Sequence, residues 1–120
     1  MGALRLQSRS DLPLDQTWAW LLAAAPDLPP LLAAAHPRLQ LTLGAVDPAG
    51  RRLAMRLHQG PVTGPFELAA VAAEPGAASI VCSGEVPTGL DDELETVLVL
   101  QTVFRRWARV SAPSAPLEPG

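Results

Sequence analysis

Hydrophobic residues recur with two spacings along the 120-residue chain, and each spacing predicts one kind of secondary structure. They alternate with polar or small residues in five stretches, which is the period of a strand with one buried face: 3–9, 39–45, 53–57, 66–73 and 78–86. They recur every three or four residues in three others, which is the period of an amphipathic helix: 12–26, 28–36 and 91–110. The pattern predicts an α+β fold. A first strand and two short helices precede an antiparallel sheet, of about five strands in all, that wraps on a long C-terminal helix.

The C-terminal helix, 91–110, has the broadest apolar face. Its hydrophobic residues cover well over half of the helix circumference: Leu94, Val97, Leu98, Leu100, Val103, Phe104, Trp107 and Ala108. Acidic residues gather in its first turns and arginines in its last, which suits the helix dipole at both ends. We expect this helix to lie buried against a broad surface. The Pro-rich stretch after it, 111–120, has no periodicity and predicts a disordered tail beyond a single domain, 1–110.

The first helix carries most of its hydrophobic residues on one stripe: Leu14, Trp18, Leu21, Leu22 and Ala25. Pro26 ends this pattern, and Pro37 blocks continuation of the second short helix. Trp20 lies on the side of the first helix away from the stripe. It either marks a surface for a partner or packs against the second short helix.

Charge and composition exclude several classes of protein. The net charge is −3, all nine basic residues are arginines, and they fall in short groups without the long run of a nucleic-acid-binding tail. No uninterrupted apolar run reaches the roughly eighteen residues of a membrane span, and the first residues lack the apolar core of a signal peptide. The single cysteine cannot form an internal disulfide. We therefore expect a cytoplasmic protein with no nucleic-acid partner and no transmembrane segment.

The stretch GPVTGPF, 60–66, interrupts the alternating pattern. A phosphate-binding loop needs a lysine and a following helix, whereas this stretch has no lysine and leads into a strand. A flexible linker is disfavoured because alternating apolar segments continue on both sides. We expect a rigid strand-to-strand connection in which Gly60 adopts unusual backbone angles. Pro61 and Pro65 withhold N–H donors there, as at a sheet edge, a bulge or a sharp bend.

The polar residues predict no catalytic, cofactor-binding or metal-binding site. His36 and His58 lack a second ligand at metal spacing. Cys82 lies on an apolar strand face, where a small buried side chain is expected rather than a nucleophile. Glu67 and Glu85 could form a carboxylate pair, but alternation turns Glu67 away from the apolar face of its strand and predicts exposure to solvent.

The order of elements and two short motifs carry a family resemblance. The motifs are W-x-x-L in the first helix and G-P-[VI]-x-x-x-F between two middle strands, matched by Trp18, Leu21, Gly60, Pro61, Val62 and Phe66. In these respects the chain resembles the helix-grip fold of the START-like superfamily, also called the polyketide cyclase or SRPBCC superfamily. Its closest likeness there is to the carbon monoxide dehydrogenase G-like proteins. That family usually has another hairpin where this chain has only residues 87–90, so a smaller sheet with an exposed edge is expected.

The resemblance implies an apolar cavity under the C-terminal helix that could hold a small apolar ligand or a lipid. Its expected lining is Leu41, Leu43, Met55, Leu57, Phe66, Leu68, Ile80, Leu100, Phe104 and Trp107. Dense packing favours the plainer alternative, in which these side chains fill one another's space. The leading hypothesis for function is a non-enzymatic hydrophobic-ligand-binding or accessory protein. The alternatives are a cavity-less interaction module that forms a homodimer or docks a partner and, third, a small cyclase or hydrolase.

Overall fold

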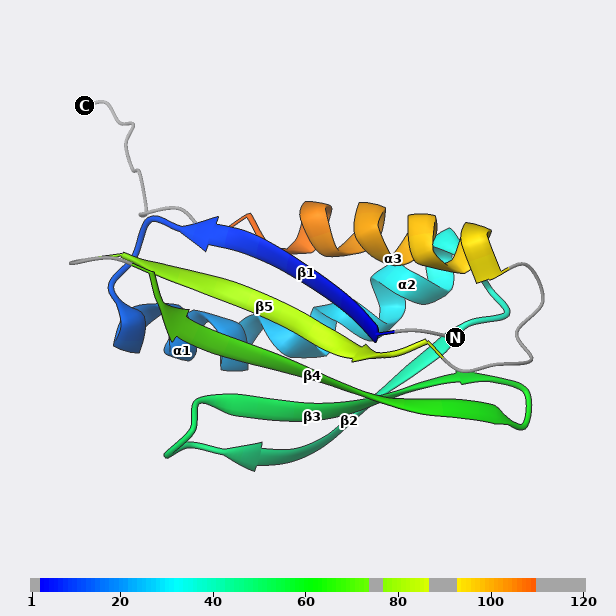
Figure 1. Ribbon diagram of the computed structural model, residues 1–120, viewed down its shortest axis with the longest axis horizontal. Coiled ribbons are helices and arrows are strands. Elements are labelled where there is room, and N and C mark those ends of the chain that lie inside the picture. Colours follow the sequence, from blue (N-terminus) through cyan, green and yellow to red (C-terminus); the bar gives the residue numbers. More distant parts are fainter. Residues whose placement is uncertain (1–2, 74–76, 87–92, 110–120) are drawn as a thin grey trace.

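The computed structural model describes residues 3–73, 77–86 and 93–109. Within these ranges the elements are β1 (Ala3–Ser10), α1 (Leu14–Ala24), a 3₁₀ turn η1 (Ala25–Asp27), α2 (Leu28–Ala35), β2 (Gln40–Asp47), β3 (Arg52–Gln59), β4 (Val62–Ala72), β5 (Ala78–Glu85) and α3 (Glu93–Trp107) (Figure 1). The predicted α+β class is confirmed, with a five-stranded antiparallel sheet and two short helices after the first strand. The predicted tail, 111–120, lies outside the described residues.

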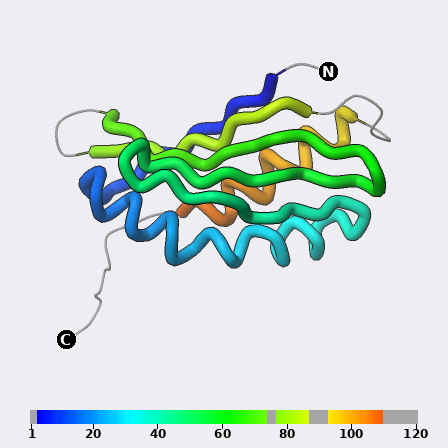
Figure 2. The backbone as a smooth tube through the Cα atoms, turned by 90° about the horizontal axis from the view of Figure 1, so that it is seen from below, coloured from blue at the N-terminus to red at the C-terminus, as the bar shows by residue number. Residues whose placement is uncertain are grey.

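The strands follow the order β1-β5-β4-β3-β2 across the sheet, so the last strand pairs with the first. β1 and β2 are therefore the two edges of the sheet. The helices pack on one face of the sheet, where α3 runs along α2 and β1 (Figures 1 and 2). Side chains alternate between the two faces of a strand, so every second residue of each strand contributes to the core under the helices.

The predicted alternation holds on β3 and fails at the end of β2. On β3 the buried apolar residues share one face: Leu53, Met55 and Leu57. On β2 the register shifts between Leu43 and Val46, so Val46 rather than Ala45 shares the face of Leu43. A β-bulge of this kind adds residues to one strand and changes the face of those that follow. Because β2 is an edge strand, Leu43 and Val46 stay 37% and 45% exposed.

The GPVTGPF stretch forms the turn after β3 and the first part of β4. The residues on either side of Gly60 and Pro61 pair with each other, which leaves these two as a two-residue hairpin loop. Gly60 has a φ of +59°, as the first central residue of a type II′ turn requires. Pro65 pairs with β3 alone, because pairing with β5 begins at the next residue. The unusual glycine angle and the edge position of the second proline are thus confirmed.

The helix α1 is rotated from its predicted orientation. Thr17 is fully buried, whereas Trp18 is half-buried and Leu22 is exposed. The Thr17 hydroxyl donates a hydrogen bond to the carbonyl of Leu12 at 3.0 Å and lies 2.7 Å from the Ser10 hydroxyl. These bonds hold a polar residue inward, and they tie the turn after β1 to the first turns of α1.

The C-terminal end of α3 is fixed to α1 and β1. The Trp107 indole Nε1 donates a hydrogen bond to the carbonyl of Ala24 at 2.8 Å, and the Ser8 hydroxyl donates one to the carbonyl of Ala108 at 3.1 Å. Trp20 of α1 packs on Trp107, with their ring centroids 5.0 Å apart. Trp20 therefore belongs to the contact between α1 and α3, which neither sequence-based interpretation of this residue anticipated.

Candidate functional site

An apolar cavity lies between the inner face of the sheet and α3. Side chains from all five strands, α2 and α3 line it: Leu4, Leu6, Leu28, Leu32, Leu41, Met55, Leu57, Phe66, Cys82, Leu100, Val103 and Phe104. Its volume is about 30 Å³. One water needs roughly 10–15 Å³ of such space, whereas ligand pockets usually have roughly 300–1,000 Å³. In this conformation the cavity is a small gap in a nearly closed core.

Six of the ten residues predicted for the cavity line it: Leu41, Met55, Leu57, Phe66, Leu100 and Phe104. Leu68 and Ile80 are fully buried elsewhere in the core. Trp107 packs against Trp20 at the far end of α3. Leu43 is 37% exposed beside the bulge of β2 and does not contribute to the wall.

The predicted cavity lining included no residue of β1 or α2, although both elements form part of the wall. Leu4 and Leu6 face the cavity from β1, and Leu28 and Leu32 face it from α2. The alternation of β1 places both of its leucines on one face, but only the pairing of β1 with β5 brings that face beside the cavity. Helical spacing likewise puts the two α2 leucines on one face without saying what that face contacts.

Gly84 makes room for the ring of Phe66 in the cavity wall. The two residues lie opposite each other in the pairing of β4 with β5. A Cβ atom on Gly84 would lie 2.5 Å from Cγ of Phe66 and 2.5 Å from the carbonyl oxygen of Pro65. The Phe66 ring therefore occupies the space that any other residue at position 84 would need.

Cys82 contributes the single thiol of the chain to this wall. Burial removes the thiol from water and raises its pKa from 9.0 to about 12. The thiolate is the nucleophilic form of cysteine, so Cys82 is unreactive near neutral pH. The prediction of a small buried side chain is confirmed.

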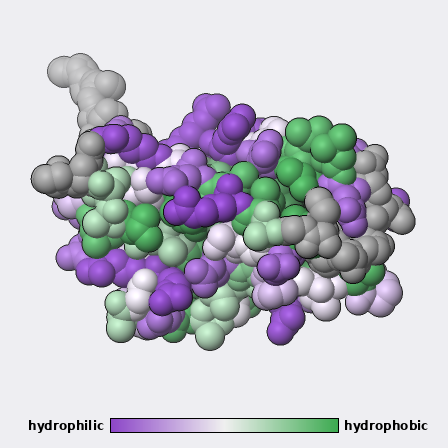
Figure 3. Space-filling view, in the orientation of Figure 1, coloured by the Kyte–Doolittle hydropathy of each residue, from purple (hydrophilic) through white to green (hydrophobic). Residues whose placement is uncertain are grey.

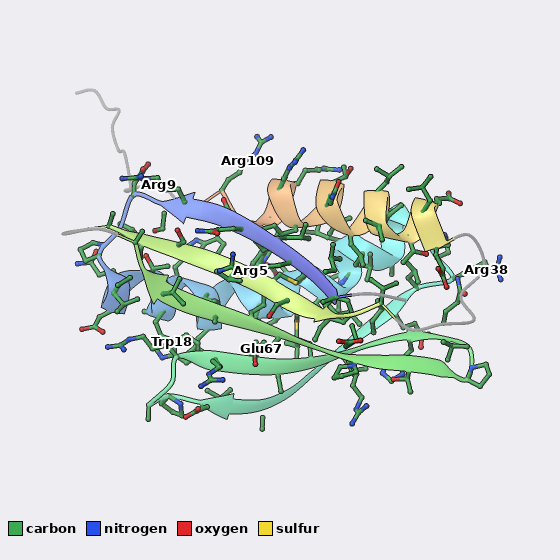
Figure 4. All side chains as sticks on the ribbon, viewed as in Figure 1. Arg5, Arg9, Trp18, Arg38, Glu67 and Arg109 are labelled. Atoms are coloured by element: carbon green, nitrogen blue, oxygen red, sulfur yellow. The ribbon has the colours of Figure 1, made fainter. Side chains whose placement is uncertain are left out.

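The other candidate residues lie away from the cavity. His58 Nε2 is 3.0 Å from Thr42 Oγ1, in a cross-strand contact on the outer face of the sheet. Glu67 also lies on that face (Figure 4), and it is half-buried rather than exposed as predicted. Glu85 is exposed at the end of β5. Among the described residues, no group of three His, Cys, Asp or Glu side chains could hold a metal ion.

The first half of α3 has an apolar outer side. Leu94 and Leu98, one turn apart, are 71% and 53% exposed. Figure 3 shows this hydrophobic area over the start of α3. A surface hollow of about 190 Å³ beside it is lined by Ala35, Glu95, Leu98, Val99 and Thr102. The prediction of a helix buried around most of its circumference is therefore wrong for this half of α3.

No described helix is long and apolar enough to cross a membrane. No family model matches the sequence, and no curated protein matches it at a significant level.

Several solved structures share the fold. The protein XoxI from Bacillus cereus matches with a TM-score of 0.62 and 14% identity, over 91% of this chain and 92% of that one. Ara h 8.0201 matches with a TM-score of 0.53 and 16% identity, over 88% and 94% of the two chains. The di-domain ARO/CYC protein BexL of the BE-7585A biosynthetic pathway matches with a TM-score of 0.56 and 13% identity, over 90% of this chain and 44% of that one.

The chain shares the helix-grip fold of these structures. At these identities the matches show the fold alone. The START-like resemblance noted in the sequence is thus supported at the level of architecture, with five strands in the sheet.

Proposed function

We propose that this START-like protein binds a small apolar ligand between its sheet and α3 and catalyses no reaction. The observation that supports the proposal is the composition of the cavity wall, which is apolar throughout and draws on every strand, α2 and α3. The raised pKa of the Cys82 thiol argues against nucleophilic chemistry in the same wall. A small cyclase or hydrolase therefore ranks last.

The volume of about 30 Å³ means that a ligand of more than a few atoms enters only if part of the wall moves. The element best placed to move is α3. Its C-terminal end is fixed through Trp107 and Ser8, whereas Leu94 and Leu98 near its start face solvent. We expect the first half of α3 to tilt outward about its fixed end when a ligand binds.

Two tryptophan substitutions on α3 distinguish the effect of filling the cavity from the general effect of adding an indole ring to this helix. Leu100→Trp adds volume to the cavity because Leu100 lines it. Leu98→Trp, the matched control, adds the same ring on the exposed side of the same helix. In an NMR titration with hexanol, we expect the wild type and Leu98→Trp to bind alike. Leu100→Trp should bind about tenfold more weakly, a loss of about 1.4 kcal/mol.

Binding that survives Leu100→Trp unchanged would contradict the proposal, because the probe would then lie outside the cavity. The natural ligand is sought by native mass spectrometry of protein purified from its own host, where a co-purifying apolar mass is expected. Protein that is bare in this experiment and also fails to bind hexanol would reject the proposal.

The exposed leucines favour a second candidate function, a protein-interaction module whose partner is a second copy of the chain. α3 is acidic in its first turn and basic in its last. Two α3 helices packed antiparallel would bring Glu95 of one copy towards Arg105 and Arg106 of the other, with Leu94 and Leu98 between the copies. A dimer in light scattering that Leu98→Ser dissociates would support this candidate. A monomer at every micromolar concentration would reject it.

We also propose that the chain is most similar in its features to the carbon monoxide dehydrogenase G-like proteins, that it is located in the cytoplasm, and that it forms a single domain ending near residue 110.

A further inference from the structure

Where α2 meets α3, two buried polar atoms have no hydrogen-bond partner among the residues that the structure describes. They are Oγ1 of Thr96, whose side chain is fully buried, and Nδ1 of His36. Buried polar atoms in folded proteins nearly always have a partner, in the protein, in ordered water or in a ligand. The pair therefore indicates a place where a polar group of another molecule fits.

Both residues lie one helical turn beyond the apolar cavity, towards the same end of the molecule. Thr96 precedes the cavity-lining Leu100 by four residues and shares its side of α3. His36 follows the cavity-lining Leu32 by four residues and caps α2. The start of α3 lies beside the end of α2 (Figure 1). The sequence neighbours of the two residues line one shared surface hollow: Ala35 and Glu95.

We propose that Thr96 and His36 form the polar end of the ligand site, and that the ligand is an apolar molecule ending in one uncharged hydroxyl group. The apolar part of this ligand lies in the cavity, and its hydroxyl reaches Thr96 Oγ1 and His36 Nδ1. The inference rests on the proposed binding of an apolar ligand and adds the chemical class of that ligand.

A hydroxyl matches both atoms better than the other common polar groups. Thr96 Oγ1 can donate and accept, and His36 Nδ1 does one or the other according to the ring tautomer. A hydroxyl also donates and accepts, so it fits either tautomer, whereas a carbonyl only accepts.

A carboxylate fits less well because of its charge. It would place a negative charge beside the acidic first turn of α3, which contains Glu93 and Glu95. Removing a carboxylate from water beside other negative charges is costly, which favours the neutral group.

The test compares three probes with the same alkyl chain and different end groups: hexanol, chlorohexane and hexanoate. In NMR titrations of the wild type, hexanol is expected to bind about tenfold more tightly than chlorohexane, and hexanoate is expected to bind most weakly. Thr96→Val keeps the shape of the side chain and removes its hydroxyl, so it should reduce the preference for hexanol by about threefold, because the ligand hydroxyl then keeps only His36 Nδ1 as a partner. Thr102→Val is the matched control, because the exposed Thr102 hydroxyl donates to the carbonyl of Leu98 on the same helix. It should leave the preference unchanged.

Thr96→Val also gives a readout that needs no ligand. If Thr96 Oγ1 has no partner in the empty protein, its replacement by a methyl group removes a buried unpaired atom. The melting temperature should then rise by a few degrees, and Thr102→Val should leave it unchanged. A lower melting temperature for Thr96→Val would mean that an internal water or another group already satisfies the hydroxyl, and it would overturn the proposal.

The outcomes distinguish this proposal from the binding function on which it rests. Equal binding of hexanol and chlorohexane by the wild type overturns the polar end but leaves apolar binding in place. A preference for hexanol that is as strong in Thr96→Val as in the wild type, or a preference for hexanoate, also overturns it. Failure of all three probes to bind overturns both proposals.

Discussion

Raising the pH above 9 is expected to destabilise the protein through one thiol. Burial raises the pKa of Cys82 from 9.0 to about 12 in the folded protein, whereas in the unfolded chain the thiol titrates near its ordinary value. Between these two pKa values the thiol loses its proton in the unfolded chain but keeps it in the folded protein. The contribution of the neutral thiol to stability is therefore complete below pH 9 and declines as the pH rises. The chain contains no lysine and no tyrosine, and arginine titrates higher. Cys82 is therefore the side chain that changes charge in this range.

The size of the effect follows from the difference between the two pKa values, 12 − 9 = 3 units. At about 1.4 kcal/mol per unit, the free energy of unfolding should fall by about 4 kcal/mol between pH 9 and pH 12. This is a large part of the roughly 5–15 kcal/mol that stabilises a typical domain.

Urea unfolding followed by circular dichroism at several pH values from 8 to 12 measures this slope. Cys82→Ala is the control, and we expect it to start from a lower stability and then to show a flat profile over the same range. A wild-type profile as flat as that of Cys82→Ala would refute the reasoning, because the thiol would then be open to solvent in the folded state. Titration of the thiolate absorbance in the native protein would locate its pKa directly.

Three further predictions concern packing, each measured as the free energy of unfolding in urea. Trp107→Phe removes the indole N–H that donates to α1, and it should lower the free energy of unfolding by about 2–3 kcal/mol. Trp18→Phe, the control, should lower it by less than about 1 kcal/mol. Equal losses would mean that the hydrogen bond does not hold α3. Phe104→Ala should cost about 3–5 kcal/mol because its ring is buried, and a cost near zero would place the ring outside the core. Gly84→Ala should cost about 1–3 kcal/mol by displacing the ring of Phe66. Combining it with Phe66→Leu should recover part of that loss, whereas strict additivity would argue against the contact.

The hydrophobic spacing predicts most of the fold because nearly every element keeps one period throughout. The hairpin at Gly60 and Pro61 could also be predicted, since glycine and proline limit the backbone angles of a turn locally. The bulge of β2 could not, because its small residues Gly44 and Ala45 mark neither face and the partner strand sets the register. The rotation of α1 could not be predicted from the helical spacing, because the hydroxyl that holds Thr17 inward belongs to Ser10, which lies outside the helix.

The candidate site was less predictable than the elements around it. Alternation indicates that Leu57 and Phe66 face inward. The volume of the cavity, however, is the small difference between the space enclosed by the sheet and helices and the volume of the side chains that fill it, and the sequence does not give this difference. The contribution of β1 depends on its pairing with β5, which joins distant parts of the chain. Thr96 is a threonine within a mostly apolar helix face. The sequence does not reveal that its hydroxyl is buried without a partner among the described residues.

The hydrogen bonds that fix α3 join residues 100 and 83 positions apart, whereas β2, β3 and β4 each pair with the next strand in sequence. Contacts between nearby segments form first during folding, because closing a long loop costs more chain entropy. We therefore expect β1 and α3 to dock last, onto a meander that is already formed. Since both elements contribute to the cavity wall, the cavity is created in the final step of folding, and partial unfolding of the same elements would reopen it.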